Sequence, residues 1–327
     1  MNARQRFRET MRYGSPDRLP CFEEGLRDGV LARWREQGLG PKADPGEMFE
    51  FDRRERIAVD LGFHPAVKRW PASRRGLAAL RRRLDADDPA RLPADWAARV
   101  KAWVSSGAVL ELHVHSGFFL SMGVGDWPRL RELLFQVADQ PALVAEMMEI
   151  YGLFAARMAE RVLRDVEVDL ASFSEPIAGS DGPLLSPRTY RQVVLSSYRP
   201  ALEVLRRRGV ETIAFVTYGN SRPLLGSVFE AGFNCLWACE TNPEAMGYRS
   251  LRRQFGRRVR LIGGIDLDAV AAGRAAIRRE FRDKVRPLLA EGGYVPLADG
   301  RVRENVPFEN YVYYRRLLEE AARAGGV

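Results

Sequence analysis

Cysteine, histidine and lysine are scarce in this chain of 327 residues. The cysteines, Cys21, Cys235 and Cys239, are too few for a disulfide framework, which suits a reducing compartment. The sequence lacks the run of about 18 apolar residues that predicts a membrane span. Its charged N-terminus also lacks the apolar segment of a secretory signal. We therefore expect a cytoplasmic protein that does not bind membranes.

The positive charge of the chain is carried almost entirely by arginine. The formal net charge is +8, and only Lys42, Lys68, Lys101 and Lys284 among the 51 basic residues are lysines. The arginines are mixed with acids, as in RRRLDADD and RREFRDKVR, whereas a nucleic-acid surface clusters basic residues beside stacking aromatics. We expect no nucleic-acid partner, and the net charge favours a small anionic substrate.

The pattern of apolar residues predicts an α/β fold. From about residue 100 onward, short apolar runs alternate with longer segments of helical periodicity, which is typical of βα units and a parallel sheet. The length fits one domain over residues 1–327, an α/β barrel with an N-terminal extension, in which residues 25–107 are insertions over one mouth. Strands are predicted at 19–23, 109–114, 168–173, 212–217, 233–238, 260–264 and 293–297, and the longest helix at 141–166.

Polar residues within the strand at 109–114 and directly after it are candidates for chemistry. A period of two places Glu111, His113 and His115 on one face. Such a face would hold a metal ion, transfer protons, or consist of hydrogen-bonded histidines that shape a pocket. These alternatives remain open, and a zinc site made by the three residues is the least favoured of them.

Other candidates follow the remaining strands, where a parallel barrel places its active site. Glu175 comes after the strand at 168–173 and before a glycine-rich loop, which suits a general acid or base, or an ion pair with an arginine. Asp299 stands close to two arginines that would hold a carboxylate or pair internally. The predicted substrate-binding residues after the strands are Tyr218, Asn220, Glu240, Asp266, Asp299, Arg301 and Arg303.

Four segments resemble the uroporphyrinogen decarboxylase-like superfamily, in its order and spacing. They are RFRETMRYGSPDRLP, EPIAGSDGPLLSP, LIGGIDLDAVAAG and GGYVPLADGRVRENVPFENYVYY. The resemblance covers nearly the whole chain. It implies a distorted (β/α)8 barrel of the TIM type, a pocket at the C-terminal mouth and a homodimer.

The resemblance also implies two well-known activities, and the chain departs from both. Decarboxylases of this superfamily carry an arginine-rich R-Q-A-G-R-Y segment that handles the acetate groups of a tetrapyrrole without a cofactor. Here the segment reads CFEEGLR, with Arg27 as its one cation, and Asp299-Gly300 lies where those enzymes have a histidine-glycine pair. The substrate is therefore expected to differ from uroporphyrinogen III.

The second branch comprises methyltransferases that work with a corrinoid protein. They bind zinc through a His-x-Cys pair before a Gly-Asn pair and through a later cysteine. This chain has Val216 and Tyr218 at the matching positions and no cysteine after Cys239. Zinc-activated thiol methylation is therefore not expected.

These observations favour a metal-independent lyase, a decarboxylase of a small carboxylated or aromatic molecule. Glu175, His113 or His115 would transfer the proton, and the residues after the strands, with Arg27, would bind the substrate. No cofactor is expected. The alternatives are a methyltransferase or demethylase component that works with a corrinoid protein, and a non-catalytic ligand-binding or partner barrel.

Overall fold

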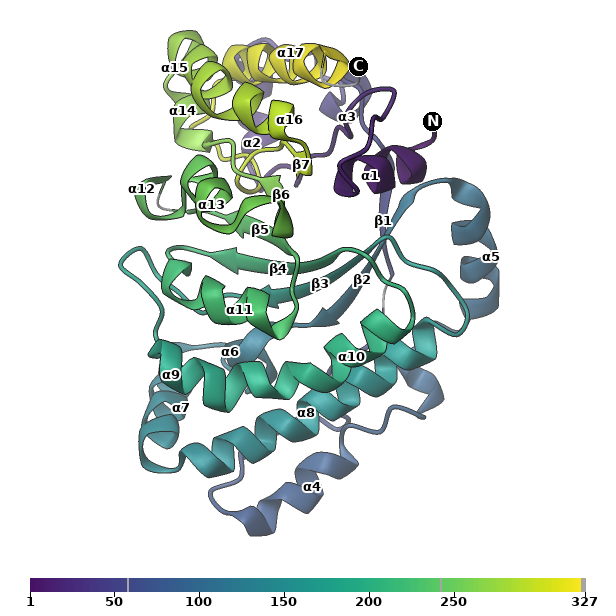
Figure 1. Ribbon diagram of the computed structural model, residues 1–327, viewed down its shortest axis with the longest axis vertical. Helices are drawn as coiled ribbons and strands as arrows, with labels where there is room; N and C mark the ends of the chain where they lie inside the picture. Colours follow the sequence, from purple (N-terminus) through teal and green to yellow (C-terminus); the bar gives the residue numbers. More distant parts are fainter. Residues whose placement is uncertain (58, 242, 325–327) are drawn as a thin grey trace. The chain divides into compact units, whose positions relative to one another are not determined.

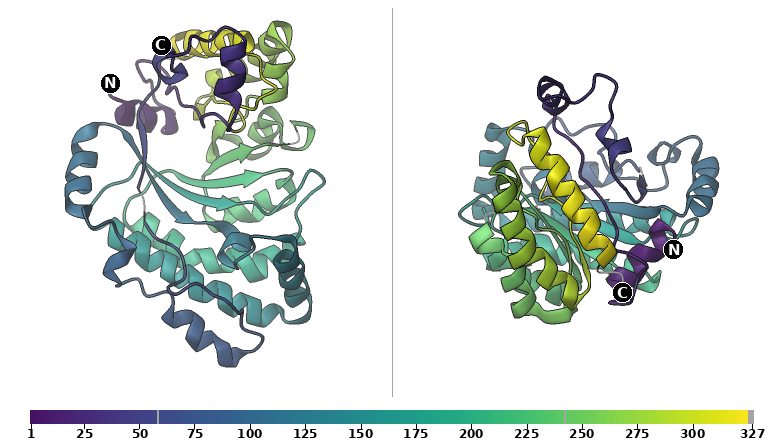
Figure 2. Two further views of the ribbon diagram at one scale, coloured as in Figure 1. Left: turned by 180° about the vertical axis from the view of Figure 1, so that it is seen from behind. Right: turned by 90° about the horizontal axis from the view of Figure 1, so that it is seen from above.

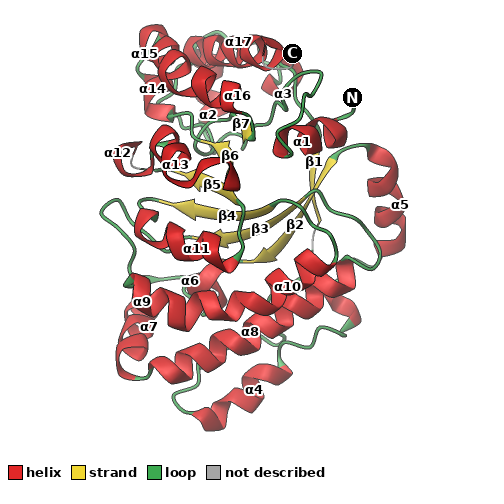
Figure 3. Ribbon diagram, in the orientation of Figure 1, coloured by secondary structure: helices red, strands yellow, loops and turns green. Residues whose placement is uncertain are grey.

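The computed structural model describes residues 1–57, 59–241 and 243–324, along which helices alternate with strands (Figures 1 and 3). The chain divides into two compact units. The first unit comprises Met1–Arg54, Gly107–Val109 and Cys235–Val327, and the second comprises Glu55–Ser106 and Leu110–Asn234. The ladders within the units are parallel, which confirms the predicted α/β class.

The predicted barrel is shown only in part. The described residues contain seven strands, so the eight strands of a complete (β/α)8 barrel are not seen. A single domain over residues 1–327, with residues 25–107 over the mouth, stays a prediction; residues 58, 242 and 325–327 lie outside the described ranges. No helix in those ranges is long and apolar enough to cross a membrane.

The second unit is built on a parallel ladder of β2 (Val109–His115), β3 (Leu170–Glu175) and β4 (Ile213–Tyr218). The predicted long helix is α8 (Pro141–Val162), and its apolar stripe is buried, as expected from its periodicity. It packs against α10 (Arg199–Arg207) and α4 (Leu77–Arg82) (Figure 1). The other helices are η1 (Arg74–Gly76), η2 (Pro89–Arg91), α5 (Trp96–Ser106), α6 (Gly117–Ser121), α7 (Trp127–Asp139), α9 (Pro187–Thr189), η3 (Tyr190–Val194), η4 (Leu195–Tyr198), η5 (Arg222–Leu224) and α11 (Leu225–Ala231).

The first unit contains the parallel strands β5 (Cys235–Cys239), β6 (Arg260–Gly263) and β7 (Tyr294–Val295). Its C-terminal helix α17 (Phe308–Ala324) packs against α14 (Leu267–Ala271) and α15 (Arg274–Glu280) (Figure 2). The other helices are α1 (Ala3–Met11), α2 (Val30–Glu36), α3 (Pro45–Met48), α12 (Pro243–Met246), α13 (Tyr248–Phe255), η6 (Gly256–Arg258), η7 (Phe281–Val285) and α16 (Arg286–Glu291).

The predicted strand at 19–23 is wrong. Its backbone groups bond outside any ladder: the Cys21 carbonyl accepts from the Asp52 amide, and the Leu19 amide donates to Ala322 at the end of α17. The sequence analysis also missed β1 (Arg54–Ile57), because the sequence RERI shows no apolar alternation. The other predicted strands are present, with ends displaced by a few residues.

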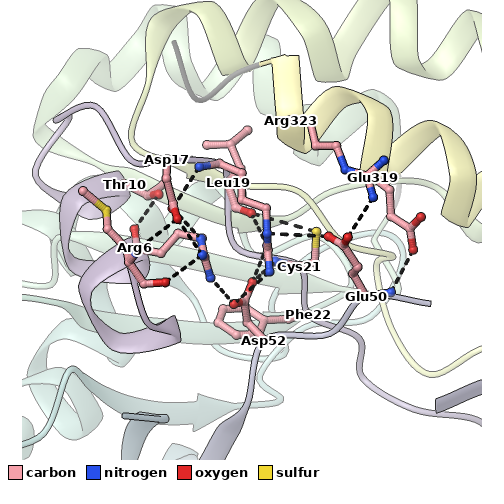
Figure 4. Close-up of polar contacts among 12 residues, drawn as sticks. Arg6, Thr10, Asp17, Leu19, Cys21, Phe22, Glu50, Asp52, Glu319 and Arg323 are labelled. Atoms are coloured by element: carbon pink, nitrogen blue, oxygen red, sulfur yellow. Dashed lines mark hydrogen bonds and ion pairs between the residues drawn. The ribbon is translucent and has the colours of Figure 1, made fainter. Parts of the chain in front are cut away.

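Buried ion pairs fix the N-terminal segment in the first unit (Figure 4). The Asp52 carboxylate accepts hydrogen bonds from Arg6, from Arg18 at 2.7 Å and from the Cys21 amide at 2.8 Å. Asp17 accepts from the Arg6 Nε at 2.8 Å. Asp17 and Arg18 of the segment RFRETMRYGSPDRLP therefore have a structural role here, because they hold α1 and the following segment in place.

Candidate functional site

Glu175 ends β3 and is completely buried. One carboxylate oxygen accepts from the Phe118 amide at 2.9 Å, and the other accepts from the hydroxyls of Tyr190, at 3.3 Å, and Tyr198. Burial raises the pKa of the Glu175 carboxyl to about 7, although hydrogen bonds from Tyr198, Phe118 and Tyr190 favour the charged form. The Glu175 carboxyl is therefore expected to titrate near neutral pH, away from solvent.

The expected common face of Glu111, His113 and His115 is wrong for His115. The pairing of β2 with β3 changes register between His113 and His115, which marks a β-bulge. Glu111 accepts from Ser172 at 2.6 Å, whereas the His115 ring stacks with Phe173 at a centroid distance of 6.2 Å. Because Ser172 and Phe173 are consecutive in β3, they face opposite sides, and so do their partners.

Both strand histidines are held neutral. Burial lowers the pKa of His113 to about 3, and the Arg56 charge adds to the effect. Burial likewise lowers the pKa of His115 to about 3. His113 contacts Ser116 at 3.1 Å, while His115 lies against the rings of Tyr151 and Tyr198. Among the residues that the structure describes, no three or more histidines, cysteines, aspartates or glutamates are grouped so as to hold a metal ion.

The end of β4 carries Tyr218 and leads to Asn220, both half-buried. The Asn220 amide donates to the Gly179 carbonyl at 2.8 Å, and its side chain accepts from the amide of Arg222, the first residue of η5. The glycine-rich loop after β3 therefore lies against the end of β4. Valine at position 216 and tyrosine at 218 offer no pair of zinc ligands at this strand end.

Polar residues of the first unit converge after its strands. Glu240 follows β5, and its amide donates to the Asp299 carbonyl at 2.6 Å; the Asp299 amide donates to the Ile265 carbonyl at 2.8 Å, beyond β6. Arg27 arrives through a parallel bridge between Leu26 and Val302, and its guanidinium pairs with the Glu240 carboxylate. The structure thus brings Arg27, Glu240 and Asp299 together.

Asp299 is the buried acid of this group, with 4% of its surface exposed. Its carboxylate accepts from the Leu267 amide at 3.3 Å. Burial raises the pKa of Asp299 to about 6; the Leu267 hydrogen bond opposes this shift, and the negative charge of Asp266 adds to it. Asp299 therefore exchanges a proton near neutral pH.

The other predicted residues of this unit, Asp266, Arg303 and Arg301, differ in their contacts and exposure. Asp266 caps α14 by accepting from the Asp268 amide at 2.8 Å. Arg303 pairs with Asp268 at 3.1 Å, so it lies beside the acidic group. Arg301 is exposed.

The side chains of Cys239 and Arg54 lie beside these acids and were not predicted as site residues. Cys239 is surrounded by charges: burial raises its pKa well above the usual range, nearby Glu24, Asp299 and Glu240 raise it further, and Arg54 opposes them. Arg54 was missed because β1 was not predicted. The sequence did contain a signal for Cys239. A period of two places Cys235, Trp237 and Cys239 on the same face of the buried strand β5.

The candidate residues are therefore divided between the two units. His113, His115, Glu175, Tyr218 and Asn220 belong to the second unit, and Arg27, Glu240, Asp266, Asp299, Arg301 and Arg303 belong to the first. Convergence of both groups on one cavity stays a prediction.

Comparisons with known proteins identify related sequences and folds. The sequence model of uroporphyrinogen decarboxylase (URO-D) matches residues 126–311. A solved structure described as a methyltransferase from Methanosarcina mazei has a similar fold, with a TM-score of 0.55 at 14% sequence identity; the likeness covers 98% of this chain and 99% of that chain. No curated protein sequence matches the chain. At this identity, the structural likeness concerns the fold alone.

Proposed function

Since the chain belongs to the uroporphyrinogen decarboxylase family, we propose that it is a lyase that decarboxylates a small carboxylate-bearing molecule. The observation that supports the proposal best is the grouping of Arg27, Glu240 and Asp299 after the strands of the first unit. It combines a cation for a substrate carboxylate with a buried acid for proton transfer. The substrate proposed is smaller than uroporphyrinogen III and is handled by side chains of the protein alone.

Arg27 is the proposed carboxylate anchor. In the free protein its guanidinium is paired with Glu240, and the two side chains are 41% and 46% exposed. A substrate carboxylate would replace Glu240 on the guanidinium, whose planar N–H groups match a carboxylate in a bidentate fashion. Arg303, paired with the exposed Asp268, is the second cation in reach of the site.

Asp299 is the proposed proton donor. In the reaction, the bond between the substrate carbon and its carboxylate breaks, CO2 leaves, and the electron pair stays on the carbon, stabilised by an unsaturated group of the substrate. Protonated Asp299 then gives its proton to that carbon and is reprotonated from water. A carboxyl group with a raised pKa is suited to this step because it stays partly protonated near neutral pH.

The proposal is tested by CO2 release from carboxyl-labelled aromatic and heteroaromatic acids, tetrapyrroles included. We expect release from at least one small acid, and we expect Arg27→Gln to raise KM about tenfold or more, since it removes a charged hydrogen-bond donor. Arg33→Gln is the matched control, because Arg33 is exposed and pairs with Glu36 of its own helix. Absence of CO2 release from every acid that stabilises the protein would refute the reaction.

Methyl transfer with a corrinoid protein is the second candidate, and the likeness to the Methanosarcina methyltransferase fold favours it. Zinc does not fit the end of β4, where Val216 and Tyr218 stand, so the acceptor would not be a zinc-bound thiol. Mixing the protein with methylcobalamin and candidate acceptors distinguishes the two functions: loss of the methylcobalamin absorbance supports this candidate. We also propose that the protein is a homodimer, and a measurement of its molecular mass in solution tests this.

A further inference from the structure

Trp237 in β5 carries a buried hydrogen-bond donor without a partner in the described part of the chain. The side chain is 3% exposed, and its indole Nε1–H finds no acceptor among the described residues. Trp34 shows the usual situation: it is also buried, and its Nε1 donates to the Val306 carbonyl at 2.8 Å. Because a buried donor without a partner is destabilising, the free N–H of Trp237 calls for an acceptor.

Arg54 lies against the same indole. Its guanidinium carbon is 4.7 Å from the centroid of the Trp237 ring and 5.5 Å from that of Phe22, and its Nη2 donates to Glu24 at 2.8 Å. These contacts fix the orientation of the guanidinium, and 20% of the side chain stays exposed. The oriented guanidinium of Arg54 and the indole N–H of Trp237 are neighbouring hydrogen-bond donors. Together they suit one ligand group that carries oxygen acceptors.

The acceptor is expected to be anionic because Arg54 supplies a permanent positive charge. Trp237 lies two residues before the end of β5, and Glu240, the partner of Arg27, follows that end directly. The charges of Arg54, Glu240 and Asp299 also all affect the Cys239 thiol between them. A ligand that binds both Arg27 and the Trp237–Arg54 pair needs one carboxylate for Arg27 and a second for the pair.

We propose that Trp237 and Arg54 form a second carboxylate-binding subsite, so that the ligand of this protein is a dicarboxylate. The inference rests on the proposed decarboxylase function and extends it. Trp237 and Arg54 hold the carboxylate that the product retains, while the other carboxylate is lost. A monocarboxylate would leave one of the two cation positions empty and bind more weakly.

The test is a fluorescence titration of the full-length protein with phthalate, succinate and benzoate. We expect a dicarboxylate to change the tryptophan emission, and Trp237→Phe to abolish that change and weaken binding about tenfold or more, as measured by calorimetry. Arg54→Met, which keeps the apolar stem, is expected to weaken binding to a similar extent. Trp34→Phe is the matched control and should leave binding unchanged while lowering the melting temperature, because it removes a satisfied hydrogen bond.

The melting temperature of the unliganded variant separates a binding role from a structural one. Loss of the unsatisfied N–H should leave the melting temperature of Trp237→Phe unchanged or raise it. Equal affinity of Trp237→Phe and the wild type for the dicarboxylates, or no emission change with any of the three acids, would overturn the subsite. Binding through Trp237 without CO2 release would instead refute the reaction and keep the subsite.

Discussion

At the scale of single residues, the acids of the first unit differ in how far they are buried, and their chemistry follows from this difference. Glu240 is 46% exposed and is neutralised by Arg27, which makes it a replaceable partner. Asp299 is buried beside further acids, so its neutral form is favoured. In the proposed reaction, Glu240 therefore gives up Arg27 to the substrate carboxylate and Asp299 donates the proton.

Asp299→Asn tests the proton donor directly. The asparagine oxygen can still accept from the Leu267 amide, but the side chain cannot donate a proton to a carbanion. We expect kcat to fall by about 10²- to 10⁴-fold with little change in KM. Wild-type activity should decline as the pH rises above about 6, where Asp299 loses its proton. Asp283→Asn is the control, since Asp283 is exposed; a wild-type rate in Asp299→Asn would remove Asp299 from the mechanism.

Glu240 and Asp299 follow different strands and lie beside each other, because the carboxyl ends of parallel strands share one edge. The same reasoning could not find Trp237, since a tryptophan inside a buried strand has the pattern of an ordinary core residue. Its free N–H is a property of the surrounding atoms, which no spacing reveals.

At the scale of the elements, strands with continuous apolar runs were predictable and the irregular ones were not. β1 carries mostly charged residues, and its place beside other strands depends on contacts far along the chain. The bulge in β2 inserts one residue between His113 and His115, and this reverses the face of His115. Side chains alternate between the two faces of a strand only as far as such a bulge. The sequence around His113 contains no local signal for the bulge.

Gly117, which begins α6 after β2, is predicted to be indispensable for the position of Glu175. Its φ of +82° is unfavourable for other residues, and a Cβ atom there would lie 2.3 Å from the Ser174 carbonyl oxygen. We expect Gly117→Ala to lower the free energy of unfolding by about 3 kcal/mol through backbone strain and displacement of the Phe118 amide from Glu175. Urea unfolding measures the effect.

The matched control for this variant is Gly226→Ala, in the exposed face of α11. A Cβ atom at Gly226 meets nothing within 4 Å, so the substitution should stabilise the helix by about 0.5–1 kcal/mol. Similar free energies of unfolding for Gly117→Ala and Gly226→Ala would contradict the predicted clash of a Cβ atom at position 117 with the Ser174 carbonyl oxygen.

At the scale of the whole molecule, buried titratable groups in both units determine how stability depends on pH. Burial raises the pKa of Glu23 and Glu175 to about 7 each. In the unfolded chain, glutamates lose their protons near pH 4.3. From there to about pH 7 the folded protein binds more protons than the unfolded chain at these sites, so stability falls as the pH rises. His113 and His115 act in the opposite direction below about pH 6.5, because only the unfolded chain protonates them there.

The free energy of unfolding should therefore decrease by about 1 kcal/mol between roughly pH 6.5 and pH 8, where the glutamates outweigh the histidines. Glu175→Gln keeps a neutral side chain at all pH values, so its stability relative to the wild type should increase steadily over this range. Chemical unfolding at several pH values measures both quantities, with the exposed Glu36→Gln as the control. The buried Glu175 carboxyl accepts from hydroxyl and amide donors and has no compensating cation among the described residues. A wild-type stability that rises toward pH 8 would mean that the carboxyl is already ionised near neutral pH and that its tyrosine contacts outweigh the cost of burial.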